Sequence, residues 1–208
     1  MRYELKYSIS HLSSGAIRNE LLHHPASFTE LYPDRQVNNI YLDSSIFHCF
    51  HQNVEGHPRR KKMRLRWYGQ SALPNSGSTL EIKQKEKELG WKDSFAVEET
   101  ISDKYALMNA ISRVGVSTTD LQPVLKNTYL RSYLISHDGL FRVTIDRQQT
   151  FGFPFSKAAP FENKLYPTIV ELKYDAQYTD KASTITNYLK FRQSKNSKYV
   201  NGIEELYL

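Results

Sequence analysis

Apolar and polar residues alternate along much of this chain, which is the pattern of β-strands that bury one face. The alternation is clear in RYELKYSI at 2–9, in KMRLRWYG at 62–69 and in IVELKYD at 169–175. The 14 Tyr and 10 Phe of the chain also favour strands. We therefore predict eight strands, over residues 2–9, 37–43, 62–69, 79–87, 91–99, 124–136, 140–147 and 168–174.

Three other segments have their apolar residues at helical spacing. The first ends at Pro25, and the second begins where Ser102 or Asp103 can cap it and ends at Gly115. These signals predict helices over residues 13–24, 103–115 and 179–193. Short turns such as SHDG join most strands, so we expect an antiparallel α+β fold that forms a single domain over residues 1–208.

The chain is basic, with 28 Lys and Arg against 22 Asp and Glu, which gives a net charge of +6. This excess favours an anionic partner, which could be nucleic acid, an acidic membrane surface or a phosphate-rich small molecule. Cys49 is the only cysteine, which excludes a disulfide within the chain and suits a reducing compartment. No signal segment follows Met1, and no run approaches the roughly 20 apolar residues that span a bilayer. We expect a cytoplasmic protein.

Charged residues gather on one face of each predicted strand. Arg64 and Arg66 share a face from which Leu65 points away, and Glu171 and Lys173 share a face in the same manner. Two geometries explain this pattern. The charged faces can meet water on the outside of a sandwich, or the sheet can close with these faces inward. The pattern by itself leaves both geometries open.

A closed barrel of about eight strands has room inside for one small ligand. Cations that face one another in such a lumen repel, because the surroundings screen charge less than bulk water does. A polyanion together with a divalent metal would relieve this repulsion. Helices and the apolar outer side chains would then cover the outside of the barrel.

Stretches spread over the whole chain resemble a known family. They are YELKY at 3–7, NNIYLD at 38–43, KMRLRWYG at 62–69, LEIKQK at 80–85, YLRSY at 129–133, FRVTID at 141–146, VELKY at 170–174 and SKNSKYVNG at 194–202. In this order they resemble the triphosphate tunnel metalloenzymes, and among these the VTC (vacuolar transporter chaperone) polyphosphate polymerase domain. The resemblance implies an eight-stranded antiparallel β-barrel tunnel with flanking helices and with the charged faces inward.

The resemblance also implies a reaction. The polymerase domains of this family transfer the γ-phosphate of ATP to a growing polyphosphate chain, with Mn2+ or Mg2+ as the cofactor. The residue types suit this chemistry, because phosphoryl transfer depends on positioning and on neutralisation of charge. Arg holds phosphate oxygens with paired N–H groups, Lys adds a point charge, and a carboxylate holds the metal.

The same resemblance implies roles for individual residues. Arg64 and Arg66 resemble phosphate clamps, Glu171 resembles the metal ligand, and Lys6 resembles the lysine near the attacking group. Further phosphate ligands implied by the resemblance are Lys83, Arg131, Arg142 and, on a looser match, Lys92. The residues that would close one end of the tunnel are Lys195, Ser197 and Lys198. The catalytic candidates are Lys6, Arg64, Arg66, Lys83, Arg131 and Lys198.

One departure bears on the type of reaction. The hydrolytic branch of the superfamily opens with Glu-x-Glu-x-Lys, whereas Arg2, Glu4 and Lys6 stand at these positions here. Loss of the first carboxylate favours the polymerase over a two-metal hydrolase. A metal-dependent tripolyphosphatase or nucleoside triphosphatase remains an alternative, as does a non-catalytic subunit that binds polyphosphate or nucleotide. Because the family's polymerase domains work in membrane complexes, a separate membrane protein is a candidate partner.

Two further motifs give weaker indications of function. The basic run PRRKKMRLR at 58–66 could follow a nucleic-acid backbone, but Arg64 and Arg66 already have roles in the tunnel, so we do not expect nucleic acid as a partner. Arg59, Arg60, Lys61 and Lys62 remain as a candidate exposed patch for membrane lipid or for long polyphosphate that enters the tunnel. The spacing in HCFH at 48–51 matches no common zinc-ligand pattern. The sequence also has no nucleophile elbow of a serine hydrolase.

Overall fold

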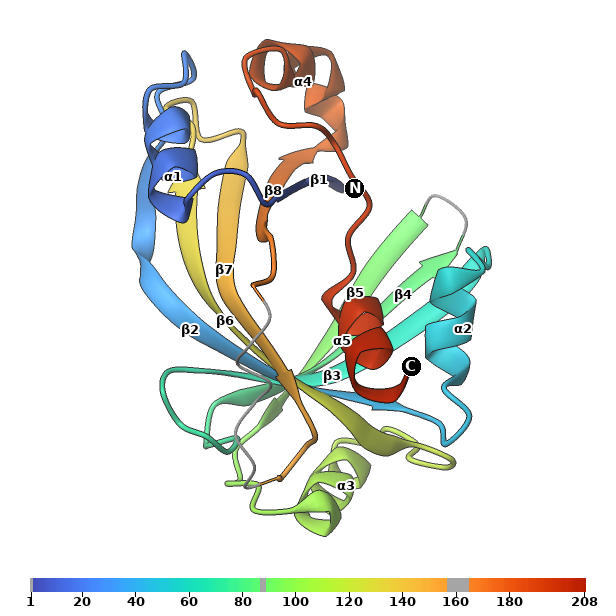
Figure 1. The fold of residues 1–208 in the computed structure, drawn as a ribbon. Coiled ribbons are helices and arrows are strands. Elements are labelled where there is room, and N and C mark those ends of the chain that lie inside the picture. Colours follow the sequence, from blue (N-terminus) through green and yellow to red (C-terminus); the bar gives the residue numbers. More distant parts are fainter. Residues whose placement is uncertain (1, 87–88, 157–164) are drawn as a thin grey trace. The chain divides into compact units, whose positions relative to one another are not determined.

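The computed structural model describes residues 2–86, 89–156 and 165–208 (Figure 1). Within these residues eight strands form one sheet in the order β1-β8-β7-β6-β2-β3-β4-β5. The strands are β1 (Arg2–Ile9), β2 (Thr29–Asp43), β3 (Arg59–Tyr68), β4 (Ser78–Glu86), β5 (Leu89–Val97), β6 (Gln122–Ile135), β7 (Arg142–Gly152) and β8 (Thr168–Asp175). The helices are α1 (Ser14–Leu22), α2 (His48–Val54), α3 (Lys104–Arg113), the 3-10 turn η1 (Ala176–Tyr178), α4 (Thr179–Thr186) and α5 (Lys198–Tyr207). The predicted α+β fold with eight antiparallel strands is confirmed.

The chain divides into two compact units. The first unit comprises Met1–Arg35, Tyr129–Gln149 and Lys164–Asn196, and the second comprises Gln36–Thr128, Thr150–Asn163 and Ser197–Leu208. The long strands β2, β6 and β7 contribute residues to both units. The single domain over residues 1–208 stays a prediction.

The core of the first unit lies under α1 and α4. These helices contribute Ile17, Leu21, Ala182 and Ile185, which pack on the apolar faces of β1, β7 and β8. The strand side chains in this cluster include Tyr7, Ile9, Val143, Ile145, Val170 and Leu172. Because strand side chains alternate, the charged residues of the same strands lie on the opposite face of the sheet.

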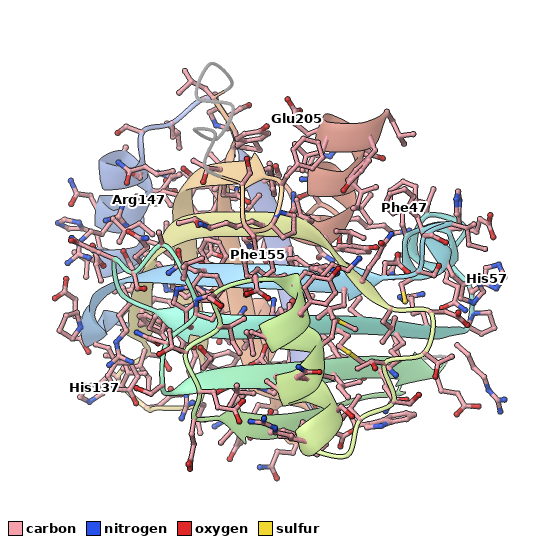
Figure 2. All side chains as sticks on the ribbon, turned by 90° about the horizontal axis from the view of Figure 1, so that it is seen from below. Phe47, His57, His137, Arg147, Phe155 and Glu205 are labelled. Atoms are coloured by element: carbon pink, nitrogen blue, oxygen red, sulfur yellow. The ribbon has the colours of Figure 1, made fainter. Side chains whose placement is uncertain are left out.

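The core of the second unit lies under α3. Figure 2 shows α3 across strands β3, β4 and β5, with Phe155 close to it. From α3, Leu107, Ala110 and Ile111 pack against the apolar faces of β2 to β5, and Phe155 packs against the same cluster. The strand residues of this core include Ile40, Leu42, Met63, Leu65, Trp67, Leu80 and Ile82. Arg64 and Arg66 therefore stand on the face of β3 that α3 does not cover.

Several element bounds differ from the sequence prediction. Strand β2 begins at Thr29 rather than at 37, and the sequence concealed this because the early part is polar and contains Pro33. Helix α4 ends at Thr186 rather than at 193. In its last turns Ser183 and Thr184 donate side-chain hydrogen bonds to backbone carbonyls, and such bonds compete with the regular helix.

The sequence did not reveal the helices α2 and α5. Helix α2 is short, and it begins after Phe47, which has a left-handed backbone with φ 53°. Helix α5 stands where we expected only a tail, and it buries Tyr199 and Ile203. Gly202 brings α5 close to β6 and β7, since a Cβ atom at this position would lie 2.5 Å from Leu125 Cδ2 and 2.7 Å from Phe151 Cδ1.

We predict that Gly202→Ala lowers the free energy of unfolding by about 1–2 kcal/mol. Overpacking costs about 1–3 kcal/mol, and the better helix propensity of Ala returns up to about 1 kcal/mol of this. Urea unfolding at constant slope measures the change. The control is Gly15→Ala, also within a helix, where the nearest neighbour of a Cβ atom would be Ser13 Oγ at 4.0 Å. Equal midpoints for the two variants would contradict the close approach of α5.

Candidate functional site

The uncovered face of β3, β4 and β5 in the second unit is densely cationic. We call this surface the basic face and define it by Arg60, Lys62, Arg64, Arg66, Lys83, Lys85 and Lys92. The strand register places Lys62 opposite Lys83 and Lys83 opposite Lys92, so that three ammonium groups lie in one row across three strands. Like charges directly opposite one another destabilise a sheet unless an anion lies near.

Glu81 is the only carboxylate on the described part of these three strand faces. Arg64 donates from Nε and Nη2 to Glu81 Oε2, both at 2.7 Å, and Lys92 Nζ lies 2.9 Å from Oε1. Arg66 Nη1 lies farther away, at 3.7 Å. Burial alone would raise the pKa of Glu81, but Arg64, Arg66 and the hydrogen bond from Lys92 lower this pKa to about 2. Glu81 therefore stays anionic over the physiological range.

Neighbouring polar side chains hold the two arginines. Arg64 Nη1 donates to Tyr41 Oη at 3.2 Å, and Arg66 Nε donates to Asn39 Oδ1 at 3.0 Å. Asn39 is fully buried and in turn donates to the backbone carbonyl of Asn127 at 3.4 Å. These bonds orient the guanidinium groups before a ligand binds. The sequence analysis assigned no role to Asn39 and Tyr41, although their spacing in NNIYLD places both on one face of β2.

The N-terminus of α5 adjoins the basic face. Lys62 Nζ donates to Ser197 Oγ at 2.8 Å, and the same oxygen caps α5 by accepting from Val200 N at 3.3 Å. Lys198 begins the helix and is 8% exposed. The structure therefore brings Ser197 and the start of α5 at Lys198 to the basic face, and a role in closing a tunnel on phosphate stays a prediction. The positive end of the helix dipole adds to the attraction for an anion.

Asp43 anchors α5 and α2 to the sheet. This carboxylate is fully buried and accepts hydrogen bonds from the backbone N–H groups of Cys49 at 2.9 Å and Phe50 at 3.0 Å. It also accepts the hydroxyl of Tyr199 from α5, and burial together with Asp43 raises the pKa of this phenol. Helices α2 and α5 lie side by side as a result (Figure 1). Asp43 lies in the motif NNIYLD and Tyr199 in the motif SKNSKYVNG, but only the tertiary structure shows that the two side chains are hydrogen-bonded.

The charged face of the first unit is mixed in sign. Arg131 donates from Nε and Nη2 to the two oxygens of Asp146, at 2.5 and 2.6 Å, in a buried two-point pair. Burial alone would lower the pKa of Arg131, but Asp146 and Glu171 hold this pKa well above its ordinary value. Its Nη2 also lies 3.5 Å from Glu171 Oε2. Arg131 is thus a fixed cation with much of its charge already balanced.

Glu171 lies among three cations in the same unit. It is 5% exposed, and Lys173 Nζ and Lys6 Nζ lie 2.9 and 3.7 Å from its oxygens. Lys6 also pairs with Glu4 at 3.1 Å and donates to the carbonyl of Asn196 at 3.1 Å. The structure therefore brings Lys6, Arg131 and Glu171 together, and their roles at phosphate and metal stay predictions.

The remaining predicted residues, Arg142, Lys195 and Lys83, are exposed. Arg142 is exposed and stands opposite Lys173 in the register of β7 and β8. Lys195 is exposed in the segment that precedes α5, and Lys83 is exposed within its row of lysines. Since each cluster is described within its own unit, the prediction that both line one tunnel stays a prediction.

The burial of charged side chains distinguishes between the two geometries that the sequence left open, in which a charged strand face either meets water or points inward. Arg66, Glu81, Arg131 and Glu171 are at most 8% exposed, although they lie on the faces opposite the apolar cores. A face that simply meets water would expose its charged groups. Buried charges on these strands instead require partners: Glu81 lies 3.7 Å from Arg66, and Asp146 pairs with Arg131.

The carboxylates of the site suit a divalent metal that also takes phosphate oxygens as ligands. Within residues 2–86, 89–156 and 165–208, no three His, Cys, Asp or Glu side chains form a group that could hold a metal ion. Mg2+ in phosphate chemistry commonly takes one or two carboxylates and fills its other positions with phosphate oxygens and water. Glu171 can supply one such carboxylate, so the residues fit a metal that binds together with a phosphate substrate.

No helix in the described part of the chain is long and apolar enough to cross a membrane.

Comparisons with known proteins bear on the family and the fold of this chain. The sequence model of the VTC domain matches residues 1–207. A candidate adenylate cyclase from Vibrio parahaemolyticus has a similar solved structure, with 14% identity, a TM-score of 0.57 and 95% of each chain covered. A candidate adenylate cyclase from Bacillus halodurans has 13% identity and a TM-score of 0.55, with 100% of this chain and 98% of that chain covered.

A third similar structure is a candidate adenylyl cyclase from Hippeastrum with a dominant triphosphatase activity. It has 13% identity and a TM-score of 0.50, with 100% of this chain and 98% of that chain covered. At these identities the likeness shows the fold alone. A search of curated proteins gives no match.

We predict that the Glu81 carboxyl titrates with a midpoint near pH 2 in the folded protein, because the arginines stabilise its anion. Since the folded pKa lies below the ordinary value, the contribution of Glu81 to stability is complete above about pH 5 and disappears as the pH falls toward 2. Side-chain carboxyl NMR measures the midpoint directly. A Glu81 midpoint above 4 would contradict the ion-pair geometry.

We predict that Tyr199→Phe lowers the free energy of unfolding by about 1–3 kcal/mol, because buried Asp43 loses one of its hydrogen-bond donors. Tyr207→Phe is the matched control on the same helix. It removes a hydroxyl that donates to the carbonyl of Val124 at 2.7 Å from a more exposed position, so we expect a smaller loss. Urea unfolding of both variants makes the comparison, and a larger loss in the control would refute the anchoring role of Asp43.

Proposed function

The chain belongs to the VTC domain family, and on this premise we propose that it transfers the terminal phosphate of ATP, or of another triphosphate, to a growing polyphosphate chain. The observation that carries the proposal is the basic face of the second unit. Seven Lys and Arg side chains stand there on three adjacent strands with Glu81 as the one described carboxylate. Polyphosphate is the ligand class whose charge density matches such a surface.

Arg64 and Arg66 are proposed to hold the phosphate groups of the donor. Their guanidinium groups are oriented by Tyr41 and Asn39, so little side-chain entropy is lost when phosphate binds. Glu81 keeps these cations in place when no phosphate is bound. A phosphate chain competes with Glu81 for their N–H donors, so that one set of ionic contacts replaces another.

The lysines neutralise charge as the phosphoryl group moves. Lys83 and Lys92 provide point charges beside Arg64, and Lys198 and Ser197 present the N-terminus of α5. In a loose phosphoryl-transfer transition state the negative charge spreads over several oxygens, which a ring of fixed cations stabilises. Lys6 is proposed to orient the acceptor phosphate, as the family resemblance implies.

Mn2+ or Mg2+ is proposed as the cofactor. Glu171 would hold the ion together with phosphate oxygens, and the bound ion would draw negative charge from the phosphates. Lys6, Lys173 and Arg131 surround Glu171 and fix its carboxylate in place. Arg131 is fixed in turn by Asp146, so this part of the site is rigid before substrate binds.

A triphosphatase is the second candidate. The Hippeastrum protein of similar fold has a dominant triphosphatase activity, and water could take the place of the acceptor phosphate at the same cations. A non-catalytic subunit that binds polyphosphate would use the same surface. A cytoplasmic location and a separate membrane-protein partner remain sequence-based proposals, and a pull-down from native membranes that returned no integral protein would count against such a partner.

The test incubates the purified protein with ATP and Mn2+ and resolves the products by phosphate length. We expect long chains together with ADP, and a loss of at least about 100-fold in rate for Arg66→Ala and Glu171→Ala, because each removes a group that stabilises the transferred charge. Lys104→Ala is the charge-matched control for Arg66→Ala, since Lys104 begins α3 over the opposite side of the sheet.

The products decide among the candidates. Free phosphate and ADP without chains would replace the polymerase by a triphosphatase. Tight binding of triphosphate without turnover would instead indicate a binding subunit. Equal loss of activity in the Lys104 control would show that general charge, rather than the basic face, supports the reaction.

A further inference from the structure

The basic face continues beyond the residues that the family resemblance assigned. Arg60 lies on the same side of β3 as Arg64 and Arg66, because the residue numbers differ by even steps along one strand. The register places Lys85 of β4 directly opposite Arg60. The four rows that begin at Arg66, Arg64, Lys62 and Arg60 extend over about 20 Å, at roughly 3.3 Å per residue. A triphosphate is shorter than this span.

The outermost row has no anion of its own. Arg60 donates to the backbone carbonyl of His57 at 3.1 Å, and neither Arg60 nor Lys85 forms an ion pair with a carboxylate in the described part of the chain. Each is only partly exposed, so their mutual repulsion is less screened than between fully hydrated side chains. Arg59 differs, because its guanidinium is paired with Glu86 at 2.7 Å.

The space beside this row is open to a ligand. Gly90 stands opposite Lys85 on β5 and presents no side chain, so the third position of the row is vacant. A groove of about 470 Å³ adjoins this end of the strands. Arg60 and Lys85 line it from the basic face, Gln52 of α2 also lines it, and the opposite face contributes Arg59, Lys61, Gln84, Glu86 and Trp91. The groove therefore offers several cations, one carboxylate that is already paired with Arg59, and room for a flexible anionic chain.

We propose that Arg60 and Lys85 form an outer phosphate subsite, which binds the part of a long polyphosphate chain that extends beyond Arg64 and Arg66. The proposal rests on the function proposed above and adds a dependence on chain length. A short phosphate ligand is held at the inner rows and does not reach the outer pair. A long chain contacts both, and the outer contacts slow its dissociation between successive additions of phosphate.

The chemistry favours polyphosphate over nucleic acid at this subsite. Polyphosphate places a negative charge on every unit of a thin chain without bases, which matches lysines and arginines that follow one strand face. Nucleic acid would in addition need stacking platforms in sequence along its path. Trp91, 45% exposed, is the only aromatic side chain among the described groove residues.

The experiment compares the affinities of tripolyphosphate and of long-chain polyphosphate for wild type and for Arg60→Ala/Lys85→Ala. Two partly exposed ionic contacts correspond to about tenfold in affinity. We therefore expect about tenfold weaker binding of the long chain and a change of less than about twofold for tripolyphosphate. The charge-matched control is Lys104→Ala/Arg113→Ala, which removes two exposed cations from α3 and should leave both affinities unchanged.

A second variant separates loss of charge from loss of fold. Arg60→Gln/Lys85→Gln keeps polar but uncharged side chains and should show the same length-dependent loss, with an unfolding midpoint equal to that of wild type. A loss of equal size for both ligands, or no loss for the long chain, would overturn the subsite. Equal binding of single-stranded DNA, with the same loss in the variant, would overturn the assignment to polyphosphate.

The outcomes also distinguish the subsite from the function on which it rests. If wild type binds neither tripolyphosphate nor long-chain polyphosphate, the proposed function itself fails. If wild type binds the long chain and Arg60→Ala/Lys85→Ala binds it equally well, only the outer subsite fails.

Discussion

The repulsion among cations on one face of β3, β4 and β5 is the constraint on which the site depends. Lys62, Lys83 and Lys92 stand opposite one another in the sheet, where like charges cost stability. Glu81 balances part of this charge and keeps the arginines within reach. The remaining positive potential attracts a phosphate chain, because binding of the chain relieves the repulsion among these cations in the folded protein.

The cations of the two units are balanced by carboxylates to different extents, and this difference suggests different roles for the two units. In the first unit Arg131 with Asp146, and Glu171 with Lys173, are close pairs in which the charges nearly balance. Groups held in this manner are rigid and change little when a ligand arrives. In the second unit cations outnumber the one described carboxylate of the basic face, so this surface attracts anions. A fixed, balanced cluster suits positioning, whereas an unbalanced one suits binding.

Much of the fold follows from local patterns in the sequence. The two-residue period located the eight strands, and it also fixed which residues share a face, so Arg64, Arg66, Lys83 and Glu171 could be placed opposite the core. The capping of α3 by Asp103 was likewise readable, since its side chain accepts from Ala106 N as the motif predicts. The sequence did not predict the exposed, polar start of β2 or the short helices α2 and α5. Tertiary packing, rather than a local sequence pattern, stabilises these segments.

The sequence by itself determined which side chains can act together along a strand, because alternation is a property of neighbouring residues. The tertiary structure decided which strands stand beside one another, and therefore that Glu81 lies between Arg64 and Lys92, or that Lys85 faces Arg60. It also decided the anchoring of α5, where Tyr199 donates to Asp43 across 156 positions of sequence. Contacts at such separations depend on chain topology and core packing, which no local pattern encodes.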